Sequence, residues 1–443
     1  MLGVTRCSLT GLWRDREFLK FWAASAISDV GSQVSALALP LIAALMLAAT
    51  PWQMGVLSAA GAAPVLVVGL FAGVWVDRLP RRPVMIAADV ARAGLLLAIP
   101  VASALGVLTI EILYAVAVLA GTLAVVFDVA FLSFIPALVR DGELIDANSK
   151  LEMTSSTAQV AGPGLGGALI SALGAPFAVL IDALSFLGSA LFLVRTRVTE
   201  TLPPRAERCG VVAEIREGLV AVVRHPILGA LARCSATISV FSGMFLSQYV
   251  LFMTRALGLG PVAVGLVFAT GGVGSLAGAL VAGKVAQRDG PGPAMLRAIL
   301  IFGLSGMGIP LAVLVPRVAL PMVVASEFAQ WMMIVIYYVN AVSVRQAIAP
   351  HRLLGRVNAT MRFLARGAFP IGSLLGGGLG VAIGVPLTLV VAACGLLLAV
   401  VWLLRSPVPS LRAMPTRGRT EGLAVPVELG DVLPIASGNA RRK

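Results

Sequence analysis

The chain has 443 residues, of which 58% are hydrophobic and 12% are charged, and its formal net charge is +13. Soluble domains carry about 25% charged residues, so this composition excludes a globular protein that covers its surface with polar groups. The basic residues lie in short loops between apolar runs rather than in one groove. This distribution argues against a nucleic-acid partner and is typical of membrane proteins.

Apolar runs long enough to cross a bilayer follow one another along the chain. A membrane-spanning helix needs about 20 predominantly apolar residues. Twelve segments satisfy this requirement, and they predict an all-α integral membrane protein. The segments cover 18–48, 54–76, 83–105, 110–139, 153–173, 177–194, 226–254, 261–285, 294–315, 319–346, 358–382 and 385–404.

The two halves of the chain repeat each other at a constant offset of 210 residues. Matching pairs include Pro51 and Pro261, Gly55 and Gly265, Gly167 and Gly377, and Gly174 and Gly384. Such a repeat predicts two six-helix bundles of parallel topology. We expect an N-terminal segment over 1–17, bundles over 18–195 and 226–405, a linker over 196–225 and a disordered tail over 406–443. The later part of the linker is predicted to form an amphipathic helix on the membrane surface.

Lysine and arginine positions predict the orientation of the chain. Only Arg255 and Arg317 fall in loops on one side, and the other basic residues lie on the opposite side or near helix ends there. Because basic loops stay in the cytoplasm, both termini and the linker are predicted to be cytoplasmic. The expected location is the cell (inner or plasma) membrane.

The loop between the second and third runs carries a glycine, an acid and three arginines at fixed spacing. These residues are Gly73, Asp77, Arg78, Arg81 and Arg82. The glycine permits close helix approach, and the arginines hold the loop on the cytoplasmic side. Setting topology could be their whole role. Asp89 and Arg92, three residues apart on the next helix, are predicted to join the same cytoplasmic charge network.

This loop pattern resembles the loop signature of the major facilitator superfamily. A second motif, Gly162-Pro163-Gly164-Leu165-Gly166-Gly167, resembles a helix pattern that accompanies proton-coupled exporters there. Within the superfamily the chain is most similar to the branch of bacterial enterobactin and macrolide exporters. That similarity rests on the two motifs and on Phe134–Val139 and Leu144–Asn148.

The resemblance implies twelve helices in two pseudo-symmetric halves. It also implies that Asp77 pairs near Arg356 or Arg362 and latches an outward-open state. The alternative for the helix motif, which includes Gly162, Pro163, Gly166 and Gly167, is a plain small-residue packing seam.

Ionisable residues inside a membrane are costly, so each is a functional candidate. Four such residues are Asp29, Asp128, Glu327 and Arg233. The resemblance implies that their helices line a central cavity. The fourth run carries Leu119–Thr122 where many drug antiporters have an arginine-glutamine element. Proton coupling is therefore expected to rest on one of the three acids. The alternatives are structural hydrogen bonding to a neighbouring helix for Asp29 or Asp128 and a snorkelling structural role for Arg233. Asp182 is expected to be structural.

These features predict a secondary active exporter of an amphiphilic small molecule, such as an antibiotic, drug or siderophore-like metabolite. Proton antiport with alternating access is the expected mechanism. A proton gradient is the expected energy source, and no cofactor is expected. The protein is expected to be a monomer embedded in lipid. The alternatives are a facilitator or importer of a small metabolite, or a non-transporting sensor or assembly protein. No nucleophile–base set or metal cluster supports an enzyme, and the two histidines, His225 and His351, argue against a histidine-rich metal site.

Overall fold

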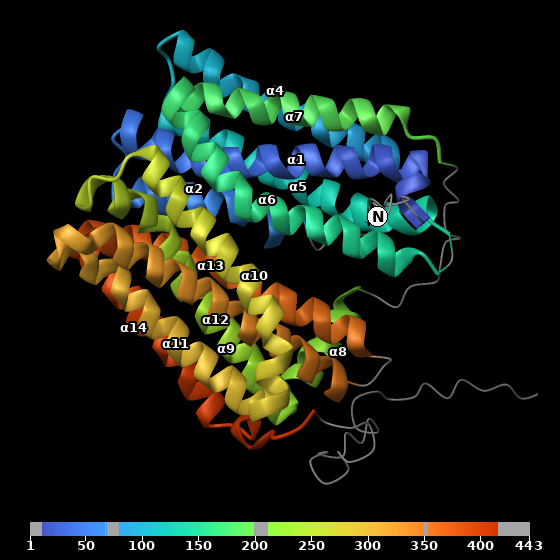
Figure 1. Cartoon of the computed structure of the whole chain (residues 1–443), viewed down its shortest axis with the longest axis vertical. Helices are drawn as coiled ribbons and strands as arrows, with labels where there is room; N and C mark the ends of the chain where they lie inside the picture. Colours follow the sequence, from blue (N-terminus) through green and yellow to red (C-terminus); the bar gives the residue numbers. More distant parts are fainter. Residues whose placement is uncertain are drawn as a thin grey trace, which may run out of the picture.

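The computed structural model describes residues 11–66, 68, 79–140, 142–198, 211–349 and 353–414, with the side chains of 211–215 excepted. All the regular elements in these ranges are helices (Figure 1).

The N-terminal half consists of helices that pack on one another. They are α1 (Arg16–Leu41), the π-helix η2 (Ile42–Met46), α2 (Pro51–Ala62), α4 (Arg81–Ala104), α5 (Ile110–Leu138), α6 (Leu144–Leu173) and α7 (Ala175–Arg195). The C-terminal half is built in the same way. Its helices are α9 (Pro226–Leu251), the π-helix η3 (Phe252–Ala256), α10 (Pro261–Asp289), α11 (Pro291–Leu311), α12 (Ala319–Ile348), α13 (Leu354–Ile383) and α14 (Val385–Leu404). Helix α8 (Val211–Arg224) precedes this second half.

Ten helices in the described ranges are long and apolar enough to cross a membrane. The two other predicted spans correspond to α2 and α6. The α-helix of α2 is described over twelve residues only, and the first turns of α6 carry Asp146, Lys150 and Glu152, which lower its mean hydropathy. Helix α6 therefore begins nine residues before the apolar run that predicts it (144 against 153). The predicted all-α membrane fold is confirmed.

The sequence repeat is also a repeat of structure. The π-helices η2 and η3 begin at Ile42 and Phe252, which are 210 residues apart. Each half also makes the same turn into its last helix. Gly174 and Gly384 have φ angles of 86° and 83°, a region in which glycine is favoured because it lacks a Cβ.

Two glycine pairs bring the halves into backbone contact. A Cβ added to Gly55 of α2 would lie 2.8 Å from Cα of Gly377 in α13. The equivalent Cβ on Gly265 of α10 would lie 2.9 Å from Cα of Gly167 in α6. These pairs join residues that the 210-residue repeat relates. No side chain larger than that of glycine fits at either contact. We call the Gly55–Gly377 and Gly167–Gly265 contacts the two glycine seams.

The halves are closed at the end where α1 passes into α2. The Arg255 guanidinium donates to the carbonyl oxygens of Ala49 at 2.9 Å and Ala44 at 3.4 Å. Gln248 Nε2 donates to the carbonyl oxygen of Pro51 at 3.1 Å. Figure 1 shows the halves close together at this end and farther apart toward the end that carries α8 and the beginning of α1. The two halves thus form a V.

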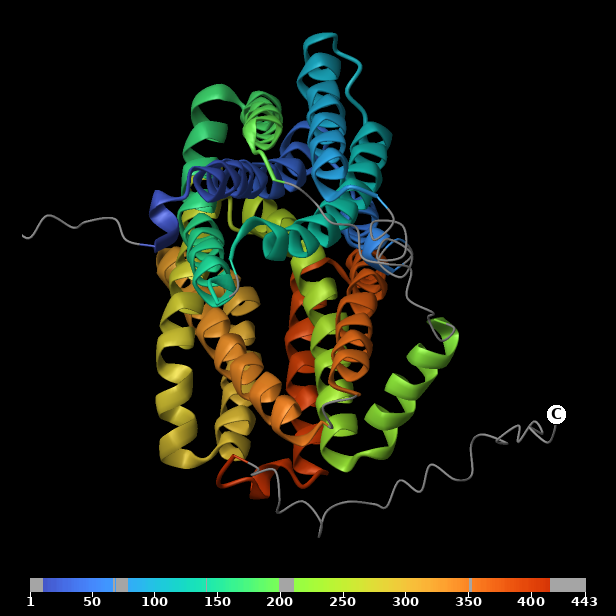
Figure 2. The same cartoon turned by 90° about the vertical axis from the view of Figure 1, so that its right-hand side faces the viewer.

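Helix α8 lies obliquely along the flank of the C-terminal half, beside α13 (Figure 2). Glu217 forms an ion pair with Arg356 of α13. His225 follows α8 and caps α9, because its Nδ1 accepts from the backbone N–H groups of Ile227 and Leu228 at 3.2 and 3.4 Å. Burial lowers the pKa of His225, which keeps Nδ1 in its acceptor form.

We expect cysteines at Gly164 and Ala269 to form a disulfide in a background without the native cysteines. A Cβ on Gly164 would lie 3.7 Å from Cβ of Ala269, and disulfides join Cβ atoms about 3.5–4.5 Å apart. After mild oxidation, the chain is cut in the linker and its mobility on a gel is measured. The disulfide is expected to keep the two halves joined. The control pair is Gly164→Cys with Leu280→Cys, because Leu280 lies further along α10 and is 70% exposed. Equal cross-linking of both pairs would contradict a specific close approach of α6 and α10 at Gly164 and Ala269.

Candidate functional site

The first cavity, which we call the Asp29 cavity, has a volume of about 540 Å³ and lies between α1, α5 and α6. It contains both predicted acids of the N-terminal half. Ser25 Oγ donates to Asp29 Oδ2 at 3.4 Å, and Asp128 is exposed to the cavity. The remaining polar lining residues are Asn148, Ser149, Glu152 and Ser155. The structure therefore brings two carboxylates from different helices into one polar space.

Two further charged residues act on the acids of this cavity and escaped sequence analysis; Glu152 lines the cavity, and Arg366 does not. Glu152 of α6 interacts electrostatically with Asp29, and Arg366 of α13 interacts with Asp128. Arg366 comes from the other half of the molecule, so the charge of Asp128 is felt across the interface. In the sequence, Arg366 is one of the basic residues near helix ends, and this position gave no sign of its interaction with Asp128.

The second cavity, the Glu327 cavity, lies within the C-terminal half and has a volume of about 250 Å³. Glu327 is only 1% exposed. Its two oxygens accept from Tyr249 Oη at 2.9 Å and from Trp331 Nε1 at 2.8 Å. Gly271 makes room for this cluster, because a Cβ there would lie 3.1 Å from Glu327 Oε1. The aromatic lining residues are Phe245, Tyr249, Phe302, Trp331, Tyr338 and Phe369.

This arrangement has a definite chemical capacity. A buried carboxylate that two neutral donors satisfy still carries its charge in a low-dielectric space, so it favours a proton or a cationic ligand. Aromatic faces attract cations as well and accept flat apolar groups. The sequence placed Glu327 in a membrane span but could not identify Tyr249 as its partner, because 78 residues separate them.

Arg233 does not join these sites. Its guanidinium lies over the Trp402 ring, 5.1 Å from the ring centroid, and its side chain is exposed. The residues lining the Asp29 and Glu327 cavities do not include it. Its position fits the snorkelling alternative.

The third cavity, the Arg92 cavity, has a volume of about 410 Å³ and lies toward the closed end of the V. Arg92 Nη2 lies 2.5 Å from Asp89 Oδ1, and both residues are buried. The predicted i,i+3 pair is therefore present, but it lies inside the N-terminal half instead of joining a surface network. The guanidinium stacks between Phe127 and Phe186, at 4.5 and 4.1 Å from the ring centroids.

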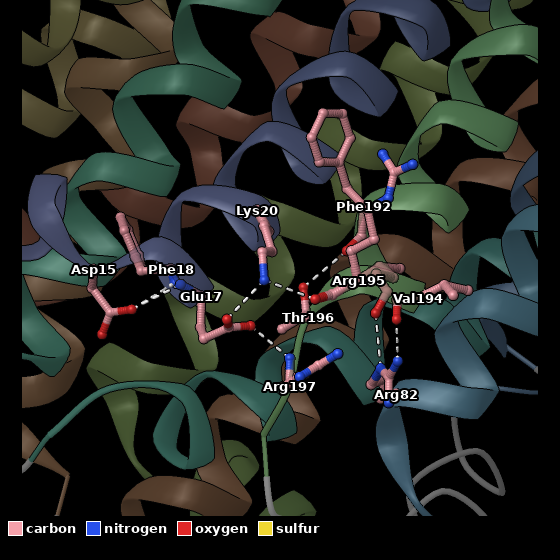
Figure 3. Close-up of polar contacts among 11 residues, drawn as sticks. Asp15, Glu17, Phe18, Lys20, Arg82, Phe192, Val194, Arg195, Thr196 and Arg197 are labelled. Carbon is pink, nitrogen blue, oxygen red and sulfur yellow. Dashed lines mark hydrogen bonds and ion pairs between the residues drawn. The ribbon is translucent and has the colours of Figure 1, made fainter.

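The predicted gating loop is described in part. Gly73, Asp77 and Arg78 lie outside the described residues, so the predicted contact of Asp77 stays a prediction. Arg82 donates through Nε to the Leu193 carbonyl oxygen at 2.8 Å and through Nη2 to the Val194 carbonyl oxygen at 2.5 Å (Figure 3). It therefore caps the carboxyl end of α7, where a cation is favoured.

The beginning of α1 holds the chain where it leaves α7. Lys20 Nζ donates to the Arg195 carbonyl oxygen at 2.8 Å and pairs with Glu17 at 2.7 Å. Glu17 Oε2 in turn accepts from the Arg197 backbone N–H at 2.5 Å (Figure 3). The first linker residues are thus bound to the N-terminal half, while α8 is paired with α13 of the other half.

The glycine motif of α6 packs this helix between α1 and α10. Gly162 lies against Gln33 of α1, and a Cβ on Gly166 would lie 3.4 Å from Cα of Val34. On the opposite side, a Cβ on Gly167 would lie 2.7 Å from the Pro261 carbonyl oxygen of α10. The motif therefore makes a packing seam at the interface of the halves.

We expect Arg92→Met to destabilise the protein by about 3–5 kcal/mol, because it leaves Asp89 buried without its cation. Thermal unfolding of the purified protein in detergent measures the effect. The control is Arg297→Ala, which breaks the more exposed pair between Arg297 and Asp289 and should cost about 0–1 kcal/mol. Similar losses for the two variants would show that the buried pair contributes no more than the surface one.

Comparison with known proteins agrees with this architecture. Residues 8–429 match the family described as Transmembrane secretion effector. The multidrug efflux pump Tap of Mycolicibacterium fortuitum is 31% identical over 356 residues, which are 77% of this chain and 84% of Tap. YfiS, an uncharacterized MFS-type transporter of Bacillus subtilis, is 28% identical over 267 residues, which are 59% of this chain and 62% of YfiS, less than two thirds of that protein.

A crystal structure of a mutant of the nucleoside transporter NupG superimposes with a TM-score of 0.72. The match covers 88% of this chain and 99% of NupG at 10% sequence identity, so it shows the fold alone. With its described helices arranged in two repeated halves and a family match over nearly its whole length, the chain belongs to the Transmembrane secretion effector family of major facilitator superfamily transporters.

Proposed function

We propose that this transporter exports an amphiphilic small molecule, such as an antibiotic, drug or siderophore-like metabolite, in exchange for protons by alternating access. The two halves rock about the glycine seams. The proton gradient supplies the energy, and no cofactor takes part. The protein works as a monomer in the cell membrane with both termini in the cytoplasm, so the described state opens inward.

One observation carries the proposal: carboxylates occupy separate cavities in the two halves of a V that is closed at one end. Asp29 and Asp128 lie in a polar cavity, whereas Glu327 lies in an aromatic one. A polar cavity suits proton exchange with water, and an aromatic cavity with one acid suits an amphiphilic cation or a neutral aromatic molecule. The similarity to Tap, a multidrug efflux pump, supports export.

The gating loop and the helix motif each have a role in this cycle. Asp77, by the resemblance, latches the outward-open state near Arg356 or Arg362. In the described state Arg356 is paired with Glu217 of α8. Exchange of Arg356 between these two acids is a means by which α8 and the loop alternate. The α6 motif keeps the halves in close contact at the closed end.

Energised inverted membrane vesicles test the proposal with ethidium as the probe. A proton gradient is expected to drive ethidium uptake, and Glu327→Gln is expected to reduce it about tenfold or more by removing the cation-binding charge. Asp29→Asn and Asp128→Asn should weaken the response to the gradient. The control is Arg233→Gln, since Arg233 lies outside the Asp29 and Glu327 cavities.

Uptake that ignores the gradient in the wild type would favour a facilitator over an antiporter. Absence of flux for ethidium and for a panel of antibiotics, together with retained folding, would favour a sensor or assembly protein and overturn the proposal.

The cysteine pair at Gly164 and Ala269 tests alternating access. Oxidation ties α6 to α10 beside the Gly167–Gly265 seam and should stop ethidium uptake, because the halves can then no longer rotate about the seam. Reduction should restore uptake to the level before oxidation. The Gly164→Cys and Leu280→Cys pair receives the same treatment and should keep its activity. Full uptake by the cross-linked protein would rule out rocking at this contact.

A further inference from the structure

Asp182 of α7 is an acid that the proposed cycle has not used. Its side chain is buried at 1% exposure and lines the Arg92 cavity. Ser185 Oγ donates to Asp182 Oδ1 at 3.1 Å. Helix α1 leaves space for the carboxylate, because a Cβ on Gly31 would lie 2.6 Å from the same oxygen. The sequence predicted a structural residue, yet this carboxylate faces a cavity of about 410 Å³.

Arg92 lines the Arg92 cavity, and its two aromatic neighbours line different cavities. One of its two aromatic neighbours, Phe186, lines the Arg92 cavity, and the other, Phe127, lines the Asp29 cavity. Arg92 also interacts electrostatically with Asp182 on one side and Asp128 on the other. A single guanidinium thus faces one acid from each cavity.

The charges around Arg92 do not balance. Asp89, Asp128 and Asp182 all interact with Arg92, and Arg366 of α13 is a second cation near Asp128. Asp29 adds a further negative charge beside Asp128, so the acids outnumber the two guanidinium groups, which keep their protons in proteins. The charged groups of α4 that face Asp182 are Arg92 and Asp89, while α1 presents Gly31 and Ser35 to it. In the described part of α6, no charged residue is an electrostatic neighbour of Asp182. An excess of negative charge in a membrane interior favours proton binding.

We propose that Asp182 is a proton-binding site of the Arg92 cavity and is coupled through Arg92 to Asp128 in the Asp29 cavity. A proton from water on the outer side adds to the Asp182 carboxylate and removes its charge. Arg92 remains charged and then neutralises Asp89 and Asp128 only. The ionised form of Asp128 is thereby stabilised, and its proton leaves into the Asp29 cavity. One proton enters and one leaves.

This inference rests on the proposed antiport and adds a separation of routes to it. Protons pass through the N-terminal half, from Asp182 to Asp128. The exported molecule occupies the Glu327 cavity of the C-terminal half. Coupling between the routes is then the rocking of the halves rather than competition for one carboxylate.

The test compares gradient-driven uptake with counterflow, using radiolabelled tetraphenylphosphonium in inverted vesicles. Counterflow needs substrate binding and alternating access but no proton gradient. Asp182→Asn is expected to lower gradient-driven uptake about tenfold or more while counterflow stays within about twofold of wild type. Glu327→Gln should lose both activities. The control is Asp289→Asn, an acid-to-amide change in the pair with Arg297, away from the three cavities.

Infrared difference spectroscopy of the purified protein supplies a readout without transport. The wild type should show a protonated-carboxyl band that disappears as pH rises, and Asp182→Asn should lack it. Unchanged uptake in Asp182→Asn overturns the proposal, and so does loss of counterflow in a folded variant, which would assign Asp182 a structural role. A wild type without gradient-driven uptake removes the antiport itself, a result distinct from both.

Discussion

Backbone contact at the two glycine seams is the constraint on which the rest of this structure depends. Gly55 meets Gly377 and Gly167 meets Gly265 so closely that a methyl group has no room at either contact. This approach brings the α1–α2 connection within reach of Arg255, which closes one end of the molecule. It also sets α6 and α13 beside the opposite half, where α6 lines the Asp29 cavity and α13 contributes Phe369 to the Glu327 cavity. The seams thus determine where the path can be open.

Charge inside the membrane is distributed according to what each half can supply. The C-terminal half satisfies Glu327 with two neutral donors and surrounds it with aromatic rings. The N-terminal half instead places several acids around Arg92, with two rings stacked on its guanidinium. One environment suits a bulky apolar cation and the other suits protons. Two similar bundles have therefore acquired different chemistry through a few side chains.

Hydropathy and repetition predicted the helices and the symmetry, because both depend on local composition. The pairing of Gly55 with Gly377 needed a second kind of information, since a repeat relates equivalent residues without saying which of them touch. The same limit applies to the Tyr249 hydroxyl on Glu327 and to Arg92, which looked like a surface residue beside a basic loop. Its burial results from the way α4 packs against α7. Contacts between helices far apart in sequence depend on how these helices cross, which no local pattern encodes.

The position of the seams has a mechanical consequence. They lie toward the closed end, near Pro51 and Pro261, and the helices continue well past them toward the other face. In the proposed alternating access, each half would be a lever with a short arm on the closed side of the seams and a long arm on the open side. A rotation that shifts Arg255 slightly from Ala49 swings the opposite ends of α5 and α12 through a larger arc. Under that proposal, a small movement at the closed end suffices for a wide change of access at the open end.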